Sequence, residues 1–299
     1  MTTADPVAMP AAEAVGAGRP NSFGEFWYRF TRSKAAVIAL AFVVLMVIVA
    51  IIAPLIQSSD PFSGSSQSLA PPLTDGHLLG TDNLGRDVYS QLVNGSRVSL
   101  LIGFSVAIVG TLIGVVVGAT AGFFGGWVDA VLMRISEFFQ TLPRFVLALI
   151  IIALFGSGLS KLIFVLAILS WPQTARVVRA GFASLRSAGF VDAARVSGMP
   201  KRAIIVREIL PNVLASVIVV GSLDVAGAIL IAAALSFFGL GDPNLVSWGG
   251  MLQQAQLYLT QAWWMAVFPG VAIALVVLAF NLVGDGLNDA LNPRLRDGR

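Results

Sequence analysis

The stretch from Val98 to Val128 reads VSLLIGFSVAIVGTLIGVVVGATAGFFGGWV and contains no Asp, Glu, Lys or Arg. A helix needs about 20 apolar residues to cross the hydrocarbon core of a bilayer. This stretch is longer than that, so it predicts a membrane-spanning helix.

Glycines recur within this stretch at a fixed spacing. Gly110, Gly114, Gly118 and Gly122 are four residues apart. Small residues at this spacing allow two helices to pack closely in lipid. The pattern predicts either a static packing seam or a surface along which a second helix slides.

Five further stretches with few charged residues also predict membrane-spanning helices. They cover residues 35–59, 143–156 with an extension through 137–142, 162–178, 211–238 and 263–284. Together with 98–128 they predict six membrane-spanning helices. The third and fourth are separated only by residues 156–161.

The composition excludes several classes of protein. Of the 299 residues, 57% are hydrophobic and 12% are charged, with a mean hydropathy of +0.85. An ordinary soluble domain is about 45–50% apolar and about 25% charged, so a cytosolic enzyme, a coiled coil and a disordered chain are excluded. Without cysteine the chain has no disulfide, thiolate zinc site or thiol nucleophile. With His77 as its one histidine it has no multi-histidine metal centre.

The positions of Lys and Arg predict the orientation. If the N-terminus is cytoplasmic, all of the 19 basic residues except Arg86, Arg97 and Lys161 fall in inside segments. Inside loops carry the excess of Lys and Arg, so both termini are predicted to be cytoplasmic. The basic residues are then topology signals, which removes any need for a nucleic-acid partner. At the end of the fourth span, Arg176 and Arg179 are expected to snorkel.

Residues 1–34 are predicted to form a cytoplasmic N-terminal tail, and residues 35–57 the first membrane-spanning helix, an uncleaved anchor. The Ala-, Pro- and Gly-rich residues 1–20 predict disorder. Asn21 or Ser22 is expected to cap a short helix with an aromatic face of Phe23, Phe26, Trp27 and Phe30. We interpret it as an interfacial helix; the alternative is a plain extension of the first span.

Residues 58–96 form an outer segment. Thr81 or Asp82 is expected to cap a short amphipathic helix. Its apolar face would consist of Leu84, Val88, Leu92 and Val93. His77 stands alone in the preceding loop and is predicted to be neither a ligand nor a switch.

The inner segment from Ala180 to Glu208 combines dense charge with turn residues. Asp192 is expected to cap a short helix, and Gly198 suits the left-handed position that ends one. Pro200 suits the first turn of the next helix, and the chain is expected to re-enter the membrane at Pro211. These residues predict two short helices joined by a sharp turn under the bilayer.

This inner segment resembles the Glu-Ala-Ala loop of ABC importer permeases. The resemblance is carried by Asp192-Ala193-Ala194, Gly198 and Ile209-Leu210-Pro211, with Asp192 in place of the usual Glu. In that family the loop contains the coupling helix, which docks on the cytoplasmic ATPase. The resemblance implies a coupling role for Asp192, Ala193, Ala194, Arg195, Gly198, Met199 and Pro200.

The outer segment resembles the signature of the dipeptide/oligopeptide/nickel permease subfamily. The matching residues are Gly80, Thr81, Asp82, Gly85, Arg86 and Asp87, with Gln91 where that subfamily usually has Arg. Later matches are Phe238–Gly241, Trp248-Gly249 and Gly284–Asp289. Within the subfamily the chain looks most like the second permease of the pair.

The resemblance implies an all-α protein with the type I, MetI-like permease fold, multi-pass in the bacterial inner membrane. Residues 97–285 would form the core, with five membrane-spanning helices and a coupling loop near 190–210, and residues 286–299 a cytoplasmic tail. The implied partners are a paralogous permease in a heterodimer, two ATPase subunits, an extracytoplasmic binding protein and lipid. The chain lacks a Gly-x-x-x-x-Gly-Lys-Ser/Thr loop. ATP and Mg are therefore expected on the ATPase subunits, and no cofactor on this chain.

Asp224 is the one charge within the fifth predicted span. A carboxylate there costs at least ~2.5–3.5 kcal/mol unless it is paired or hydrated. It is expected either to line a translocation path, with Ser222 and Asn281, or to bond a neighbouring helix. No basic residue is predicted at its depth.

Peptides, nickel chelates, opines, glutathione and sugars remain alternative substrates. A secondary transporter, a membrane enzyme and a structural scaffold are the rival classes. The sequence has no internal repeat, which would favour a secondary transporter, and no catalytic constellation, which would favour an enzyme.

Overall fold

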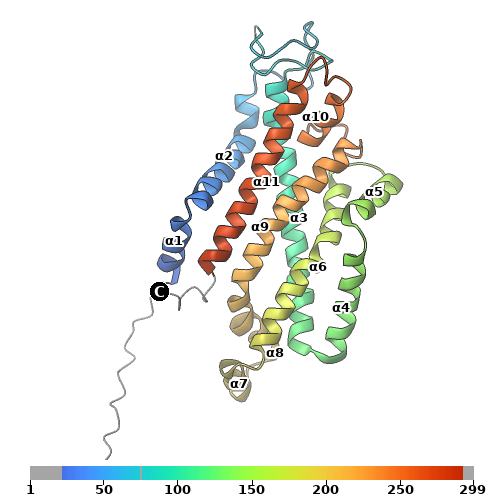
Figure 1. The fold of residues 1–299 in the computed structure, drawn as a ribbon. Coiled ribbons are helices and arrows are strands. Elements are labelled where there is room, and N and C mark those ends of the chain that lie inside the picture. The colour runs from blue at the N-terminus through green and yellow to red at the C-terminus, as the bar shows by residue number, and fades with distance from the viewer. Residues whose placement is uncertain (1–21, 75, 292–299) are drawn as a thin grey trace, which may run out of the picture.

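The computed structural model describes residues 22–74 and 76–291, and the secondary structure there is helical. Five helices are long and apolar enough to cross a membrane: α2 (Lys34–Ile56), α3 (Val88–Phe124), α6 (Leu159–Leu185), the continuous run Lys201–Phe237 that ends in α9 (Leu210–Phe237), and α11 (Trp264–Leu291). They run side by side between a looped cap and a short-helix end (Figure 1). The expected disorder of residues 1–20 lies outside the described residues, and α11 extends past the predicted core boundary at residue 285.

The third predicted span is a broken one. Helices α4 (Gly126–Thr141) and α5 (Arg144–Phe155) are bent by 82° at Leu142-Pro143. Proline lacks an N–H and forces the preceding residue out of the helical region; Leu142 is extended, with ψ 135°. The structure therefore has the six spans that the sequence predicts only if this bent pair counts as one span.

Helix α3 begins earlier than expected, and this corrects the prediction of a separate outer helix. Asp87 is its N-cap: the carboxylate accepts a hydrogen bond from the backbone N–H of Ser90 at 2.9 Å. The helical ladder then continues without a break to Phe124. Neither Thr81 nor Asp82 caps a helix, and Leu84 is exposed in the loop before it.

The chain also enters α9 differently from expectation. A short α8 (Lys201–Ala203) passes into a π-helix, η1 (Ile204–Ile209), and this joins α9 directly. Pro211 is the second residue of α9 and directly follows the junction with η1. The membrane helix therefore continues from the inner segment, and Pro211 does not start a new one.

The glycines of α3 form a close-packed seam with α6. A Cβ added at Gly114 would lie 2.6 Å from Cβ of Thr174, and one added at Gly122 would lie 2.6 Å from Cβ of Phe182. Gly110 and Gly118 face Ser170 and Ala175 in the same way. The glycine pattern thus places two helix backbones in direct contact.

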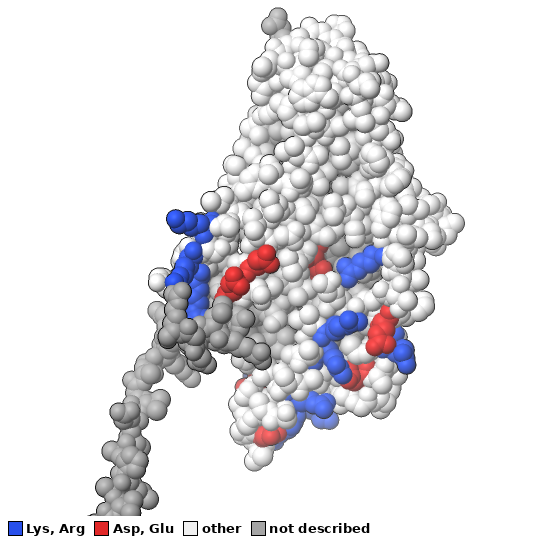
Figure 2. Space-filling view, viewed as in Figure 1, with Lys and Arg blue, Asp and Glu red and all other residues white. Residues whose placement is uncertain are grey.

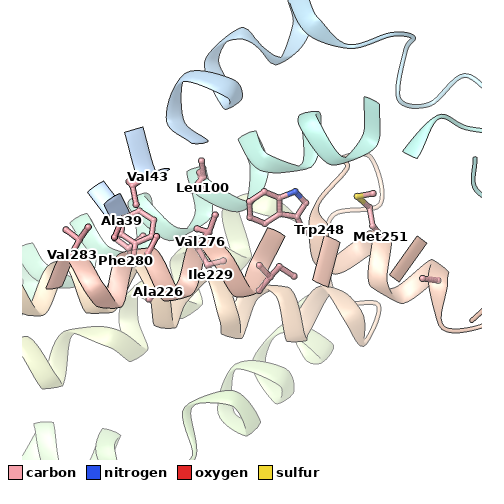
Figure 3. Packing of buried hydrophobic residues seen from close by; sticks show 14 of the residues in the cluster. Ala39, Val43, Leu100, Ala226, Ile229, Trp248, Met251, Val276, Phe280 and Val283 are labelled. Carbon is pink, nitrogen blue, oxygen red and sulfur yellow. The ribbon is translucent and has the colours of Figure 1, made fainter. Parts of the chain in front are cut away.

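One helix was not predicted from the sequence. Helix α10 (Trp248–Ala255) lies on the outer ends of α3, α9 and α11 and contributes Trp248 and Met251 to the largest apolar cluster. In Figure 3, Leu100, Val276 and Ile229 lie next to Trp248, with Phe280 of α11 further along. The indole Nε1 of Trp248 donates to the carbonyl of Leu92 at 2.9 Å.

The N-terminal helix α1 (Ser22–Arg32) confirms the prediction of a short helix separated from the first span. Ser33 interrupts the helix between α1 and α2 and is the N-cap of α2. The aromatic face is partly turned inward: Phe30 is buried against Ala36 and Ala290 and Phe26 packs on this cluster, whereas Trp27 is exposed. Placement of α1 in the membrane interface stays a prediction.

Charged residues are unevenly distributed on the visible face. Figure 2 shows Lys, Arg, Asp and Glu gathered in the lower half, toward α7 and α8, with none at the capped end. Helices α1 and α11 meet at this lower half, where Phe30 contacts Gly286. The arrangement agrees with the loop charges from which the inside orientation is predicted.

Cysteine labelling tests this orientation directly, because the chain has no native cysteine. Ser66 lies exposed in the cap and Ser184 exposed near the opposite end of α6. In intact cells Ser66→Cys is expected to react with a membrane-impermeant maleimide, and Ser184→Cys only after permeabilisation. Reaction of both from one side would contradict the topology.

The seam between α3 and α6 yields a stability prediction. Gly114→Ala forces a methyl group against Thr174 and is expected to cost about 1–3 kcal/mol, measured as a lower Tm of the purified protein in detergent. Gly221→Ala in α9 is the matched control, since its methyl would meet only Oγ1 of Thr111, at 3.5 Å. Equal Tm changes in the two variants would mean that the seam is not close-packed.

Candidate functional site

The inner end of the molecule is built by α7 (Gly189–Val196) and the turn that follows it. The N–H of Met199 donates to the carbonyl of Ala194 at 3.1 Å, and the N–H of Gly198 to that of Arg195 at 3.0 Å. This bond pair is a Schellman motif, which requires a left-handed residue. Gly198 has φ +76°, which confirms the left-handed turn predicted there.

Asp192 occupies another position than expected. Helix α7 begins four residues earlier, after the N-cap Ala188, and the N–H of Asp192 already donates to the carbonyl of Ala188 at 3.1 Å. Asp192 lies in the first helical turn, where a carboxylate is favoured by the helix dipole. Its Oδ1 accepts from Nη1 of Arg195 at 2.8 Å, on the surface. Pro200 is likewise the N-cap of α8, one position before the predicted first turn.

One side of α7 is anchored in the core. Val191 and Ala194 are buried against Ile204 and Ile209, the two buried residues of η1. The side chain of Ala194 is therefore turned away from solvent, and its predicted role in coupling stays a prediction. The outward side presents Asp192, Ala193, Arg195, Val196, Gly198 and Pro200 to solvent, with Val196 90% exposed.

The outer motif residues form a hydrogen-bonded cap. Asp82 is buried; its Oδ1 accepts from the N–H groups of Leu84 and Arg86, both at 2.8 Å, and its Oδ2 accepts from Nε2 of Gln91 at 2.9 Å. Thr81 donates to the carbonyl of Gln67 at 2.6 Å. A buried carboxylate needs such donors to offset the loss of water.

Two glycines and a tryptophan close this cap. Gly80 and Gly85 have φ +81° and +72°, and a Cβ on Gly80 would lie 2.5 Å from the carbonyl oxygen of Ala70. Nε1 of Trp264, the first residue of α11, donates to the carbonyl of Thr81 at 3.1 Å. The motif therefore connects the outer ends of α3 and α11.

Asp87 is the centre of a second network in the cap. Its Oδ2 accepts from the hydroxyls of Ser58 and Ser90 at 2.6 and 2.9 Å, and its Oδ1 lies 3.1 Å from Nδ1 of His77. Burial alone would raise the pKa of Asp87, but these hydrogen bonds outweigh it and lower the pKa below its ordinary value. His77 is therefore hydrogen-bonded, which its isolation in the sequence did not indicate.

Asp224 is buried in the middle of α9. Oγ1 of Thr174 in α6 donates to its Oδ2 at 3.2 Å, so the hydrogen bond expected from a neighbouring helix is present. Asp224 also lines a small pocket with Arg144, which corrects the prediction that no basic residue lies at its depth. Arg144 was assigned to the inner loop, but the break before α5 brings it to the pocket.

The other two predicted path residues lie elsewhere. Ser222 bonds the carbonyl of Val219 and faces Gly284 of α11, and neither Ser222 nor Asn281 lines the pocket of Asp224. Their role in a path stays a prediction.

An ion pair at the inner end of α4 was missed by the sequence analysis. Nε of Arg179 donates to Oδ1 of Asp129 at 2.9 Å, so Arg179 is paired where snorkelling was expected. The two residues are 50 positions apart in sequence, a separation at which a single sequence carries no pairing signal.

Two families match this sequence. The family described as "Binding-protein-dependent transport system inner membrane component" covers residues 110–297, and "N-terminal TM domain of oligopeptide transport permease C" covers residues 22–72. The first range contains the helices from α4 to α11, and the second contains α1 and α2.

Several transport permeases are similar in sequence to this chain. The glutathione transport system permease protein GsiD of Pectobacterium atrosepticum is 39% identical, over 91% of each chain. The di/tripeptide transport permease DppC of Pseudomonas aeruginosa is 39% identical, over 93% of this chain and 94% of its own. The dipeptide transport permease DppC of Alkalihalophilus pseudofirmus is 38% identical, over 99% and 97%.

A solved structure shares the fold. The inward-facing MetNI methionine ABC transporter matches with a TM-score of 0.55 and 20% identity. The match covers 68% of this chain and 96% of that chain. It shows the MetI-like fold that the sequence motifs predict.

The Asp87 network predicts a pH-dependent cap. A carboxyl whose folded pKa is lowered contributes stability above its unfolded pKa of ~3.9 and loses it as pH falls through the folded value. We expect Asp87→Asn to cost about 2 kcal/mol at pH 7 and to reduce the fall in Tm between pH 5 and pH 3. Asp60→Asn, at an exposed site, is the control; an unchanged pH profile in Asp87→Asn would contradict the assignment.

Proposed function

Because this chain belongs to the family of binding-protein-dependent transport system inner membrane components, we propose that it imports short peptides as the second permease of a heterodimer. It is a multi-pass inner-membrane permease of an ABC importer and not itself an enzyme; in this family separate subunits hydrolyse ATP. The relatives named for dipeptides, di/tripeptides and glutathione favour a short peptide over a nickel chelate, opine or sugar.

The partners of this proposal are a paralogous permease, two ATPase subunits that bind ATP and Mg, and a binding protein that delivers the peptide on the outer side. The surface offered to the ATPase is the outward side of α7 with the turn at Gly198. Arg195, Lys201 and Arg202 are exposed in this segment, as is Val196. An exposed apolar side chain in a basic segment fits an acidic groove.

The observation that carries the proposal is the rigid connection from this surface to the membrane core. Val191 and Ala194 of α7 pack on η1, and η1 is continuous with α9. Helix α9 carries Asp224, the buried carboxylate of the proposed path. A displacement of α7 by an ATPase is therefore transmitted along one helix to the proposed path.

The test is a reconstituted transporter in proteoliposomes, with its paralogous permease, ATPase subunits and binding protein. The wild type is expected to take up dipeptide only with ATP and binding protein present. Dipeptide uptake without ATP would contradict an ABC importer, and ATP-driven uptake of another solute class alone would contradict the peptide substrate.

Gly198→Val tests the coupling turn in the same assay. A β-branched residue is strongly disfavoured at φ +76°, so we expect at least a tenfold loss of uptake, with ATPase activity no longer stimulated by the binding protein or the ATPase no longer bound. Gly189→Val is the matched control, because an added Cβ meets nothing within 4 Å at either glycine and Gly189 lacks the positive φ. Normal uptake in Gly198→Val would mean that this turn is not the coupling element.

A further inference from the structure

The pocket of Asp224 lies between α3, α5, α6 and α9 and holds two opposite charges. Asp224 enters it from α9, and Arg144 enters it from the first turn of α5. The remaining lining includes Val106, Leu166 and Ile231, so the surroundings are apolar. Ionisable side chains at such a depth are costly and mark functional sites by default.

The two charges are not in direct contact. Among the residues that the structure describes, no ion pair within 4.0 Å joins Arg144 to Asp224. Arg144 donates one hydrogen bond, from Nη2 to Oε1 of Gln173 at 3.3 Å, out of five possible N–H donors. Most of the guanidinium is thus free to bind an anion.

The carboxylate also keeps an open oxygen. Thr174 bonds Oδ2 of Asp224, and no described residue donates to Oδ1. No fully buried side-chain oxygen or nitrogen in the described part of the chain lacks a partner, so Oδ1 is not fully enclosed, and Asp224 lines the pocket. It is therefore positioned to accept a hydrogen bond from a ligand or from water.

Two unpaired opposite charges select a ligand that carries both. A ligand with one charge would be attracted by one residue and repelled by the other, which is the basis of charge discrimination. A ligand with a cation and an anion at its two ends satisfies both residues. Short peptides with free termini have this chemistry, with an ammonium group at one end and a carboxylate at the other.

The pocket must widen before such a ligand can enter. Its volume is about 30 Å³, room for only a few water molecules, since one water needs roughly 10–15 Å³. Arg144 directly follows the break at Leu142-Pro143, where α4 and α5 meet at 82°. A change of this angle would move Arg144 relative to Asp224 without deforming either helix.

We propose that Asp224 and Arg144 form a charge-selective site in the permease that favours zwitterionic short peptides, Asp224 binding the amino terminus and Arg144 the carboxylate. The proposal rests on the proposed function of peptide import. It adds a selectivity step within the membrane to the selection made by the binding protein.

The test compares three forms of one dipeptide in the reconstituted transporter: the free peptide, its N-acetylated form and its C-terminal amide. Uptake by each variant is divided by wild-type uptake of the same form, so that the preference of the binding protein cancels. We expect Asp224→Asn and Arg144→Gln each to lower uptake of the free peptide about tenfold. The loss in Asp224→Asn should vanish for the acetylated form, and the loss in Arg144→Gln for the amide.

Two controls separate recognition from folding. Arg176→Gln removes an exposed arginine of α6 for which no hydrogen bond or ion pair is seen among the described residues, and it should leave all three ratios near one. Asp224→Glu keeps the charge and should retain the preference for a free amino terminus. If Asp224→Asn does not assemble, Arg144→Gln alone tests the proposal. Arg144 is partly exposed, so its replacement is expected to leave assembly intact.

The outcomes are distinguishable. Equal losses for all three forms, or no loss for the free peptide, would overturn the charge-selective site while leaving peptide import in place. If the wild type takes up none of the three forms, the proposed function fails, and this inference fails with it.

Discussion

The close approach of α3 and α6 is the contact on which the rest of the fold depends. Helices in lipid gain little from apolar burial, since lipid tails are as apolar as leucine, so they associate where small residues let backbones touch. Gly110, Gly114, Gly118 and Gly122 provide that surface on α3. Helix α9 packs against both α3 and α6. Helix α11 packs against α9, and α2 packs against α3 and α11.

The ends of the helices obey a different constraint. Where the chain leaves the apolar core it must bond every buried polar group, because an unsatisfied one costs about as much as several apolar contacts stabilise. At the outer end, Asp82 and Asp87 accept hydrogen bonds from the cap and from α3. At the inner end, the Schellman motif at Gly198 does the same for α7. The motif residues of both ends thus have a structural reason that does not depend on a bound partner.

The elements of the proposed function lie where regular packing is interrupted. The π-helix η1 links α7 to α9, and the break between α4 and α5 brings Arg144 into the pocket of Asp224. π-Helical segments occur often at functional sites, and a break at proline is a natural hinge. A single path of contacts therefore leads from the exposed surface of α7 through η1 to the buried carboxylate in α9.

The sequence by itself determined the fold class, the family and most of the long helices. Uncharged apolar stretches of sufficient length have one outcome in lipid, because only a helix bonds its backbone internally. It also determined the left-handed turn, since Gly198 is the residue that such a turn requires. The same local logic was wrong at Asp82 and Asp192: polar side chains suit many turns, and local sequence does not say which of them caps a helix.

Only the tertiary structure decided which distant residues meet. Helix packing brings Arg179 to Asp129 and Arg144 to the pocket of Asp224, and the fold of the outer cap brings His77 to Asp87. The distribution of basic residues assigned Arg144 to an inner segment, but the 82° break before α5 places it at the pocket of Asp224. The physical reason is that periodicity and spacing report on one helix at a time, whereas the environment of a buried charge depends on several helices together.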